Sequence, residues 1–199
     1  MREVVVATNN RHKVEEISAI LHGLPVRLIP LSDYPDAPEL KEEGATYAEN
    51  ALHKAFTVAR FTGKWALGDD TGLEVDALDG QPGLYSARFA GEGVTFADNK
   101  RKLLRLLKSV PTEKRTALFR TVLALVGPSG ESQVVEGVLH GRIAEKEQGT
   151  GGFGYDALFF IPELGKTYAE LTADEKNRIS HRARAVQKIR ESLLKTVGV

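Results

Sequence analysis

The stretch Trp65-Ala66-Leu67-Gly68-Asp69-Asp70-Thr71-Gly72 joins a short apolar segment to two consecutive acidic residues. Trp65-Ala66-Leu67 is typical of a short buried strand that ends on the Asp69-Asp70 pair. Ligands of open α/β sheets bind where strands end, so we expect both carboxylates to face a crevice there. Adjacent carboxylates repel unless a cation neutralises them, and hard oxygen ligands suit Mg²⁺ carried by a phosphate compound. The structural alternative is an Asx-type turn in which one aspartate accepts backbone hydrogen bonds.

Apolar patterns predict strands and helices on both sides of this stretch. The predicted strands cover residues 4–7, 26–29, 65–67, 118–126, 133–143 and 157–161. The predicted helices cover residues 13–21, 46–61 and 95–107, a short segment headed by Thr172 and a last segment after Ser180. The order begins β-α-β-α-β and later contains a hairpin, so we predict an α/β fold with a mixed, twisted sheet flanked by helices.

Capping and packing signals support the predicted helices. Thr46 and Glu49 have capping-box spacing, and Thr172 and Glu175 repeat it. Ser180 is the predicted N-cap of the last helix. A stripe suited to close packing on the Thr46 helix consists of Ala51, Ala55 and Ala59. One face of the last helix carries Val186, Ile189, Leu193 and Val197.

Length and composition are those of an ordinary globular domain. The 199 residues lie near the upper end of the roughly 100 to 200 residues expected per domain, so we predict one domain over residues 1–199. Hydrophobic residues make up 42% and charged residues 27% of the chain, which argues against a disordered or fibrous protein. No apolar run is long enough for a signal peptide or a membrane span, so we expect a cytoplasmic protein without a membrane partner.

Charge and residue usage exclude several classes of function. The chain has 27 basic and 27 acidic side chains, so it has no net positive charge to gather nucleic acid, and we expect no nucleic acid polymer as partner. It has no cysteine, which excludes disulfides, thiolate nucleophiles and Cys-ligated metals. The histidines lack zinc-site spacing, and no G-x-S-x-G elbow of a serine hydrolase is present.

A polar cluster, Thr8-Asn9-Asn10-Arg11-His12-Lys13, lies between the first predicted strand and helix. Helix N-termini in such turns attract anions, so these amides, the hydroxyl and Lys13 are candidate ligands of phosphate or sugar. The sequence is not a P-loop, because no Gly-x4-Gly-Lys-Ser/Thr is present. A simple capped turn is the alternative.

Further charged residues lie near the predicted Thr46 helix. Glu42 and Glu43 stand just before it, and Lys54 lies within it, four residues after Asn50, so that Asn50 and Lys54 share one face. A solvated lysine is the common explanation. Lys54 becomes a candidate phosphate ligand if that face borders the acidic pair.

The stretch Gly149-Thr150-Gly151-Gly152-Phe153-Gly154-Tyr155-Asp156 contains a formal G-x-G-x-x-G. A dinucleotide fingerprint requires a helix immediately afterwards, whereas residues 157–161 are a predicted strand, so we reject that interpretation. A glycine-rich loop that presents Phe153 and Tyr155 is suited to stacking on a flat base. A tight turn with buried aromatic residues is the alternative.

Cations also gather before and at the start of the last helix. Lys176 and the run Ser180-His181-Arg182 lie near its N-terminus, where the helix dipole disfavours positive charge, so an anionic or electron-rich group is expected nearby. In the alternative interpretation, a solvated face carries the basic side chains Arg182, Arg184, Lys188 and Arg190.

Seven motifs taken in order resemble the inosine/xanthosine triphosphate pyrophosphatase family. They are Thr8-x-Asn10-x-x-Lys13, Glu42-x-Gly44-x-Thr46, Glu49-Asn50-Ala51, Asp69-Asp70-Thr71-Gly72-Leu73, Pro82-Gly83-Leu84-Tyr85-Ser86-Ala87-Arg88, Gly151-Gly152-Phe153-Gly154-Tyr155-Asp156 and Ser180-His181-Arg182. Each motif alone is weak, but the ordered set is specific and covers nearly the whole chain.

The resemblance implies a nucleoside triphosphate pyrophosphatase, a hydrolase that acts on acid anhydrides. It implies Mg²⁺-dependent conversion of non-standard purine nucleoside triphosphates (ITP, dITP, XTP) to the monophosphate and pyrophosphate, which cleanses nucleotide pools. It also implies a homodimer and an elongated fold of two lobes with an active cleft between them.

The resemblance further implies roles for individual residues. Asp70 would be the proton acceptor and a metal ligand, Asp69 a supporting catalytic acid, and Glu42 a second metal ligand, chosen over Glu43 because it keeps the Glu-x-Gly-x-Thr spacing. The implied phosphate ligands are Thr8, Asn10, Lys13, Lys54 and Thr71. Phe153, in the Phe153-Gly154-Tyr155 loop, would stack on the purine base. The residues that face the polar edge of the base would be Asp156, Lys176, His181 and Arg182.

Two other classes of function compete with this one. A non-catalytic nucleotide-binding regulator would bind the same nucleotides without forming product. An RNA-binding module would use the basic last helix, and its affinity would fall steeply with salt.

Overall fold

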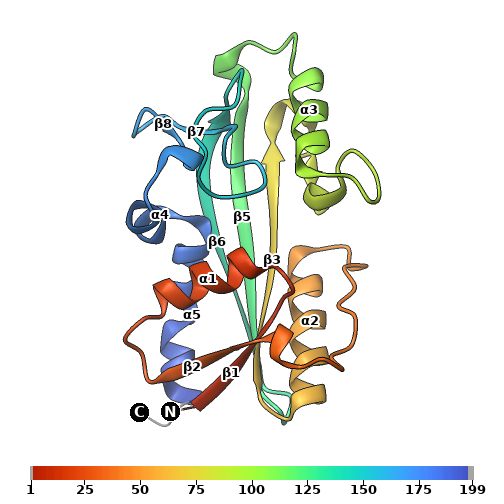
Figure 1. Ribbon diagram of the computed structural model, residues 1–199, viewed down its shortest axis with the longest axis vertical. Coiled ribbons are helices and arrows are strands. Elements are labelled where there is room, and N and C mark those ends of the chain that lie inside the picture. The colour runs from red at the N-terminus through yellow and green to blue at the C-terminus, as the bar shows by residue number, and fades with distance from the viewer. Residues whose placement is uncertain (1, 197–199) are drawn as a thin grey trace. The chain divides into compact units, whose positions relative to one another are not determined.

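The computed structural model describes residues 2–196, and Figure 1 shows its helices and strands. The strands are β1 (Arg2–Ala7), β2 (Val26–Pro30), β3 (Trp65–Val75), β4 (Pro82–Gly83), β5 (Thr116–Val126), β6 (Ser132–Ile143), β7 (Phe159–Ile161) and β8 (Lys166–Thr167). The α-helices are α1 (Arg11–Ile20), α2 (Tyr47–Thr62), α3 (Phe96–Leu106), α4 (Ala173–Ile179) and α5 (His181–Thr196).

The strand order is β2-β1-β3-β5-β6-β7-β8, with β4 paired to β3. The sheet is mixed, because β1 pairs in parallel with β2 and β3 while β3–β4, β6–β7 and β7–β8 are antiparallel. The predicted fold class is confirmed.

The chain divides into two compact units. The first comprises the chain up to Asp70, Thr121–Gly137 and the chain from His181 onward. The second comprises Thr71–Arg120 and Val138–Ser180. Strands β3, β5 and β6 therefore each contribute residues to both units. Within residues 2–196, no helix is both long and apolar enough to cross a membrane.

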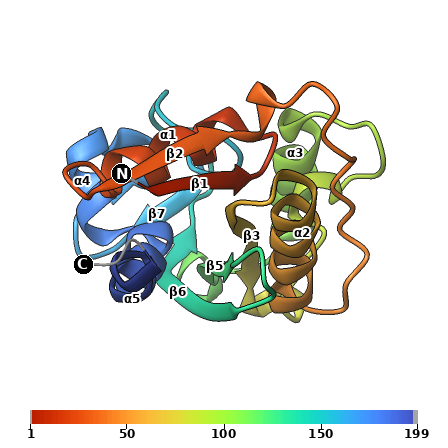
Figure 2. The same ribbon diagram turned by 90° about the horizontal axis from the view of Figure 1, so that it is seen from below.

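The first unit is built around β1, whose run Val4-Val5-Val6-Ala7 is completely buried. Successive side chains of a strand point to opposite faces. Val4 and Val6 accordingly pack with α1 and α5, while Val5 and Ala7 pack with α2. Figure 2 shows α2 on one side of β3 and α5 on the other. Burial on both faces explains why the strand is continuously apolar rather than alternating.

Small residues let α2 approach β3 closely. Ala51, Ala55 and Ala59, the predicted stripe, are buried against the strands. A Cβ atom built on Gly68 would lie only 2.1 Å from the carbonyl oxygen of Ala51. The backbone of β3 therefore lies almost in contact with the backbone of α2. This short separation determines which side chains of α2 can contact β3.

The second unit has its own core, which joins α3 to strand residues. Leu103 and Leu107 of the α3 region pack with residues such as Leu73, Phe119 and Phe159, and all five are buried.

The capping box predicted for α4 is confirmed, because the Thr172 side chain accepts from the Glu175 N–H and the Glu175 side chain accepts from the Thr172 N–H.

The main correction concerns β3, which was predicted to end at the acidic pair. The strand pairs with β1 only up to Gly68, opposite Ala7, but it continues through Asp69 and Asp70 to Val75 and pairs with β4. The polar residues Asp69 and Asp70 were expected to end the strand. They lie within it because side chains distant in the sequence compensate their charges.

Smaller differences lie at other element boundaries. β7 begins at Phe159 rather than Ala157, because hydrogen-bonded turns occupy the preceding residues. Residues 30–38 and 79–93, which lie between predicted elements, contain short 3-10 turns, and the second segment also contains β4. Glu49 accepts from the N–H of Ala45 rather than that of Thr46, although Thr46 caps α2 as predicted. Val186, Ile189 and Leu193 are buried on α5, and Val197 lies outside the described residues.

Replacing Gly68 by alanine tests the close approach of α2 and β3. The added methyl group would overlap the Ala51 carbonyl, so the helix or the strand must shift. We expect Gly68→Ala to lower the free energy of unfolding by about 2 kcal/mol or more, as overpacking of a core does. Urea unfolding measures the change, and an unaltered midpoint would show that the contact is not tight.

Candidate active site

Asp69 and Asp70 are consecutive residues of β3 whose side chains meet different helices. The carboxylate of Asp69 lies 2.5 Å from Nζ of Lys13 in α1 and accepts a 2.8 Å hydrogen bond from Nε of Arg182 in α5. The carboxylate of Asp70 accepts bonds from Asn50 (3.0 Å) and Lys54 (3.2 Å), both in α2. Strand alternation explains the difference. The two acids therefore form their close contacts with different side chains.

Asp69 is completely buried and strongly compensated. Burial alone would raise the pKa of Asp69, but the charges of Arg182 and Lys13 outweigh it and hold that pKa far below its usual value. Arg182 is itself buried and also donates to the carboxylate of Glu16 in α1. Asp69 thus remains ionised in the folded protein.

Asp70 and Glu42 are two acidic groups that meet around Lys54. Nζ of Lys54 lies 2.6 Å from Glu42 and 3.2 Å from Asp70, and Lys54 is only 3% exposed. Burial and the nearby charge of Glu42 raise the pKa of Asp70, although Lys54 opposes the shift. Burial also acts to raise the pKa of Glu42, but Lys54 outweighs it, so that pKa is lowered. Of the two carboxyl groups, Asp70 is the one that takes up a proton more readily.

Lys54 is buried next to the acidic pair, so it is not the solvated lysine of the simpler interpretation. Burial would lower the pKa of Lys54, but Asp70 and Glu42 outweigh it and keep the amine charged. Asn50, on the same helix face, holds the preceding loop as well, because its Oδ1 accepts from the N–H of Gly44 at 2.8 Å. That bond helps to fix the loop that carries Glu42. Glu43, by contrast, points to solvent with a side chain that is 79% exposed.

The turn from Thr8 to Lys13 is the capped turn that was named as the alternative. Asn10 is the N-cap of α1, and its side chain accepts from the N–H groups of His12 and Lys13. The N–H of Asn10 in turn donates to Oγ1 of Thr8 at 3.1 Å. This turn places Lys13 against Asp69. Asn9, Arg11 and His12 are exposed, and the phosphate-binding role of the whole turn stays a prediction.

In the second unit, the glycine-rich loop forms its own polar cluster. Oδ2 of Asp156 accepts from the N–H of Phe153 at 3.2 Å and from Nζ of Lys176 at 3.0 Å. Lys176 also lies over the ring of Tyr168, 4.3 Å from its centroid. A Cβ atom on Gly152 would lie 2.0 Å from the Asp156 carboxylate, so glycine is required there. A strand and not a helix follows the loop, which confirms the rejection of the dinucleotide fingerprint.

The other predicted residues of this unit occupy different surroundings. Phe153 and Gly154 are half-buried, and Thr71 is half-buried on β3. Tyr155 is buried, and its hydroxyl donates to the carbonyl oxygen of Ser86 at 2.9 Å. Tyr155 thus follows the alternative of a buried aromatic residue, and its role in base binding stays a prediction.

His181 and Arg182 open α5 in the first unit, where both are buried. Strand β6 comes very close, since a Cβ atom on Gly137 would lie 2.0 Å from the His181 carbonyl oxygen. The solvated alternative is therefore wrong for Arg182. It holds for Arg184, Lys188 and Arg190, which are exposed.

Glu16 belongs to this cluster but was not predicted from the sequence. Its carboxylate pairs with Arg182, which lies far away in the sequence. The available signal was its position three residues after Lys13 on α1, which places both side chains on one helix face. That spacing is common on solvated helices, so it could not single out Glu16.

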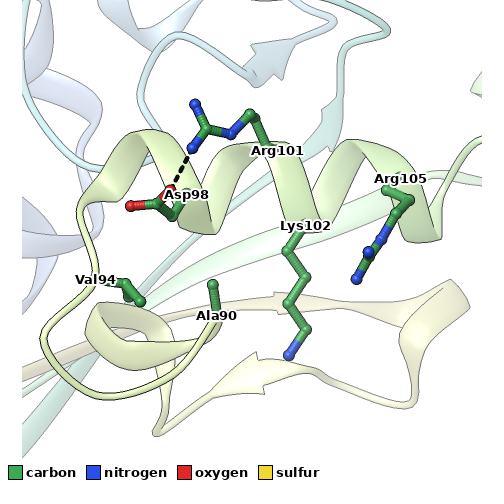
Figure 3. Close-up of a pocket in the computed structure, with 6 residues that line it drawn as sticks. All are labelled: Ala90, Val94, Asp98, Arg101, Lys102 and Arg105. Atoms are coloured by element: carbon green, nitrogen blue, oxygen red, sulfur yellow. Dashed lines mark hydrogen bonds and ion pairs between the residues drawn. The ribbon is translucent and has the colours of Figure 1, made fainter.

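A surface hollow of about 530 Å³ lies within the second unit. It borders α3, and Figure 3 shows the side chains around it. The lining residues are Ala90, Val94, Asp98, Arg101, Lys102 and Arg105. Arg101 is paired with Asp98, and Lys102 donates to the Phe89 carbonyl oxygen. None of the predicted site residues lines this hollow.

Comparisons with known proteins identify the relatives of the chain. The model of the Ham1 family matches residues 4–192. A protein of Geobacter sulfurreducens named dITP/XTP pyrophosphatase is 53% identical, with 97% of each chain covered. One of the same name from Desulforamulus reducens is 48% identical over 96% of this chain and 95% of the relative. A solved HAM1 protein from Coxiella burnetii superposes with a TM-score of 0.88 at 38% identity, covering 98% of this chain and all of that one.

Replacing Lys54 by methionine tests the buried cluster in the first unit. Methionine keeps the aliphatic length but leaves Glu42 and Asp70 facing each other without their cation. We expect Lys54→Met to lower the free energy of unfolding by about 3 kcal/mol, and adding Glu42→Gln to restore part of the loss. Lys64→Met is the matched control, because Lys64 also pairs with a carboxylate but is more exposed. Equal losses in the two single variants, measured by urea unfolding, would contradict the cluster.

Proposed function

We propose that this chain, which belongs to the Ham1 family, is a nucleoside triphosphate pyrophosphatase that acts on non-standard purine nucleotides. It would hydrolyse ITP, dITP and XTP to the nucleoside monophosphate and pyrophosphate and so cleanse nucleotide pools. The names of its relatives support the substrate class. The observation that carries the chemistry is the buried Asp70, which has a raised pKa and lies beside Glu42 and Lys54.

The residues around Asp70 fit a magnesium ion that arrives with its nucleotide. Within residues 2–196, no group of three or more histidine or acidic side chains is arranged to hold a metal ion by itself. Mg²⁺ is commonly bound by one or two carboxylates together with substrate phosphates, and Glu42 and Asp70 are two such carboxylates. When bound, the ion would neutralise phosphate charge and polarise the phosphoryl group.

Asp70 is suited to orient the attacking water and accept its proton. A general base works best when its pKa is shifted toward the working pH, and burial together with Glu42 moves the pKa of Asp70 in that direction. Asn50 fixes the carboxylate by donating to its second oxygen. Glu42, whose pKa is lowered, would stay ionised while Asp70 accepts the proton.

Cations of the first unit are suited to the triphosphate. Lys54 remains charged despite its burial, and Lys13 projects from the first turn of α1, where helix N-termini favour anions. These amines would stabilise the negative charge that grows on the pyrophosphate leaving group. Thr8, Asn10 and Thr71 are proposed as further phosphate ligands.

Residues of the second unit are suited to read a purine base. We assign stacking to Phe153, and recognition of the base edge to Lys176 and Asp156, which hold each other in place. His181 and Arg182 carry the same proposed role from the first unit. Buried donors that match a 6-oxo group reject a 6-amino base, because the amino group leaves them without an acceptor.

The proposal also covers the oligomeric state of the protein and its location in the cell. The family resemblance supports a homodimer in the cytoplasm, with no membrane or nucleic acid polymer as partner. Analytical ultracentrifugation of the full chain measures the oligomeric state directly.

Pyrophosphate release across ITP, XTP, dITP, GTP and ATP, with and without Mg²⁺, tests the proposed reaction. We expect turnover of ITP, XTP and dITP only with Mg²⁺. For ATP we expect kcat/KM to be lower than for ITP by about 100-fold or more, because the donors lose their acceptor. Binding of ITP without any product would favour the non-catalytic regulator instead.

Replacing Asp70 by asparagine tests the proton acceptor. The amide keeps the shape of the side chain but cannot accept the proton of water, so we expect kcat for ITP to fall by about 100-fold or more. Equilibrium binding of ITP should persist. Asp36→Asn, at an exposed position, is the control for the same chemical change. Full activity of Asp70→Asn would show that another group is the base.

A further inference from the structure

Lys13 already has an anionic partner in the ligand-free chain. Its Nζ lies 2.5 Å from Oδ1 of Asp69 and 3.5 Å from the Asp69 carbonyl oxygen. The Asp69 side chain is completely buried, whereas that of Lys13 remains 12% exposed. The lysine is therefore the member of the pair that can turn toward a ligand. A phosphate that binds Lys13 must compete with this carboxylate.

Arg182 allows Asp69 to release Lys13 without becoming an uncompensated buried charge. Its Nε donates to Oδ2 of Asp69, whereas the 2.5 Å contact of Lys13 is with Oδ1, and its other end is held by Glu16. Removing all compensation from a buried carboxylate is strongly unfavourable. With Arg182 in place, Asp69 keeps a counter-ion whether Lys13 is present or not.

We propose that Asp69 is a positioning residue that holds Lys13 in the absence of phosphate and competes with phosphate for it. Glu16 and Arg182 form the fixed pair that keeps Asp69 ionised and in place. The inference rests on the proposed role of Lys13 as a phosphate ligand. When the phosphate product leaves, Asp69 takes back the lysine, so the site releases its product more easily than a site with an uncommitted cation.

Asp69→Asn tests this competition, with inorganic tripolyphosphate as the probe. Tripolyphosphate has the phosphate chain of a nucleotide but no base, so it reports on phosphate binding alone. The amide can still accept from Arg182 but does not attract Lys13. We expect calorimetry with Mg²⁺ to show tripolyphosphate binding about fivefold tighter, which is the effect of losing one partly buried ion pair. In a Lys13→Met background, Asp69→Asn should bring no such gain.

Glu16→Gln provides a second test that leaves Asp69 intact. Arg182 would then serve Asp69 alone, Asp69 would hold Lys13 less tightly, and tripolyphosphate should bind about twofold tighter. Glu3→Gln is the matched control, since it makes the same chemical change at a carboxylate of the same unit that pairs with Lys64 and Arg27. If Asp69→Asn does not fold, the comparison of Glu16→Gln with Glu3→Gln decides.

Three results would overturn the proposal. Unchanged or weaker tripolyphosphate binding in the folded variants would show that Asp69 only supports the structure. An equal gain in Glu3→Gln would show a general charge effect. A gain that persists without Lys13 would exclude the lysine as its cause. Failure of the proposed function is recognised separately, because the wild-type chain would then release no pyrophosphate from ITP, whatever the variants do.

Discussion

Two acidic side chains are buried at consecutive positions of β3, and their compensation constrains the whole first unit. An ionised carboxylate taken out of water is costly unless cations and hydrogen bonds replace its hydration. Strand alternation sends Asp69 and Asp70 to different helices, so their close ion pairs are formed with different cations. Lys13 and Arg182 compensate Asp69, and Lys54 with Asn50 compensates Asp70. Helices α1, α2 and α5 are thereby each tied to the same strand.

The unequal compensation gives the two acids different chemistry. Asp69 has two cations, and its pKa is held far below the usual range, so it keeps its charge. Asp70 shares Lys54 with Glu42, and burial leaves its pKa raised. A permanently charged carboxylate can hold a cation in place, whereas one with a raised pKa can take up a proton. The division of roles that we propose for these neighbouring residues follows from this difference.

The sequence was sufficient for features that depend on local pattern. The apolar run of β1, the Thr46 cap of α2 and the capping box of α4 were all predictable. The length of β3 was not, because polar residues inside a strand are tolerated only when distant side chains compensate them. The pairing of Glu16 with Arg182 was also hidden, since contacts between residues so far apart in sequence leave no periodic signal.

Lys54 shows why packing and chemistry cannot be separated in this fold. On sequence alone it was most simply a solvated lysine of an amphipathic helix. The alanine stripe that includes Ala51 and Ala55 lets α2 lie against Gly68, where any side chain would collide with the helix backbone. That contact brings the β3 backbone, and with it Asp70, within reach of the Lys54 amine. The small residues at this contact therefore determine where Lys54 lies. A bulkier residue in place of Gly68 would move the Lys54 amine away from the Asp70 carboxylate.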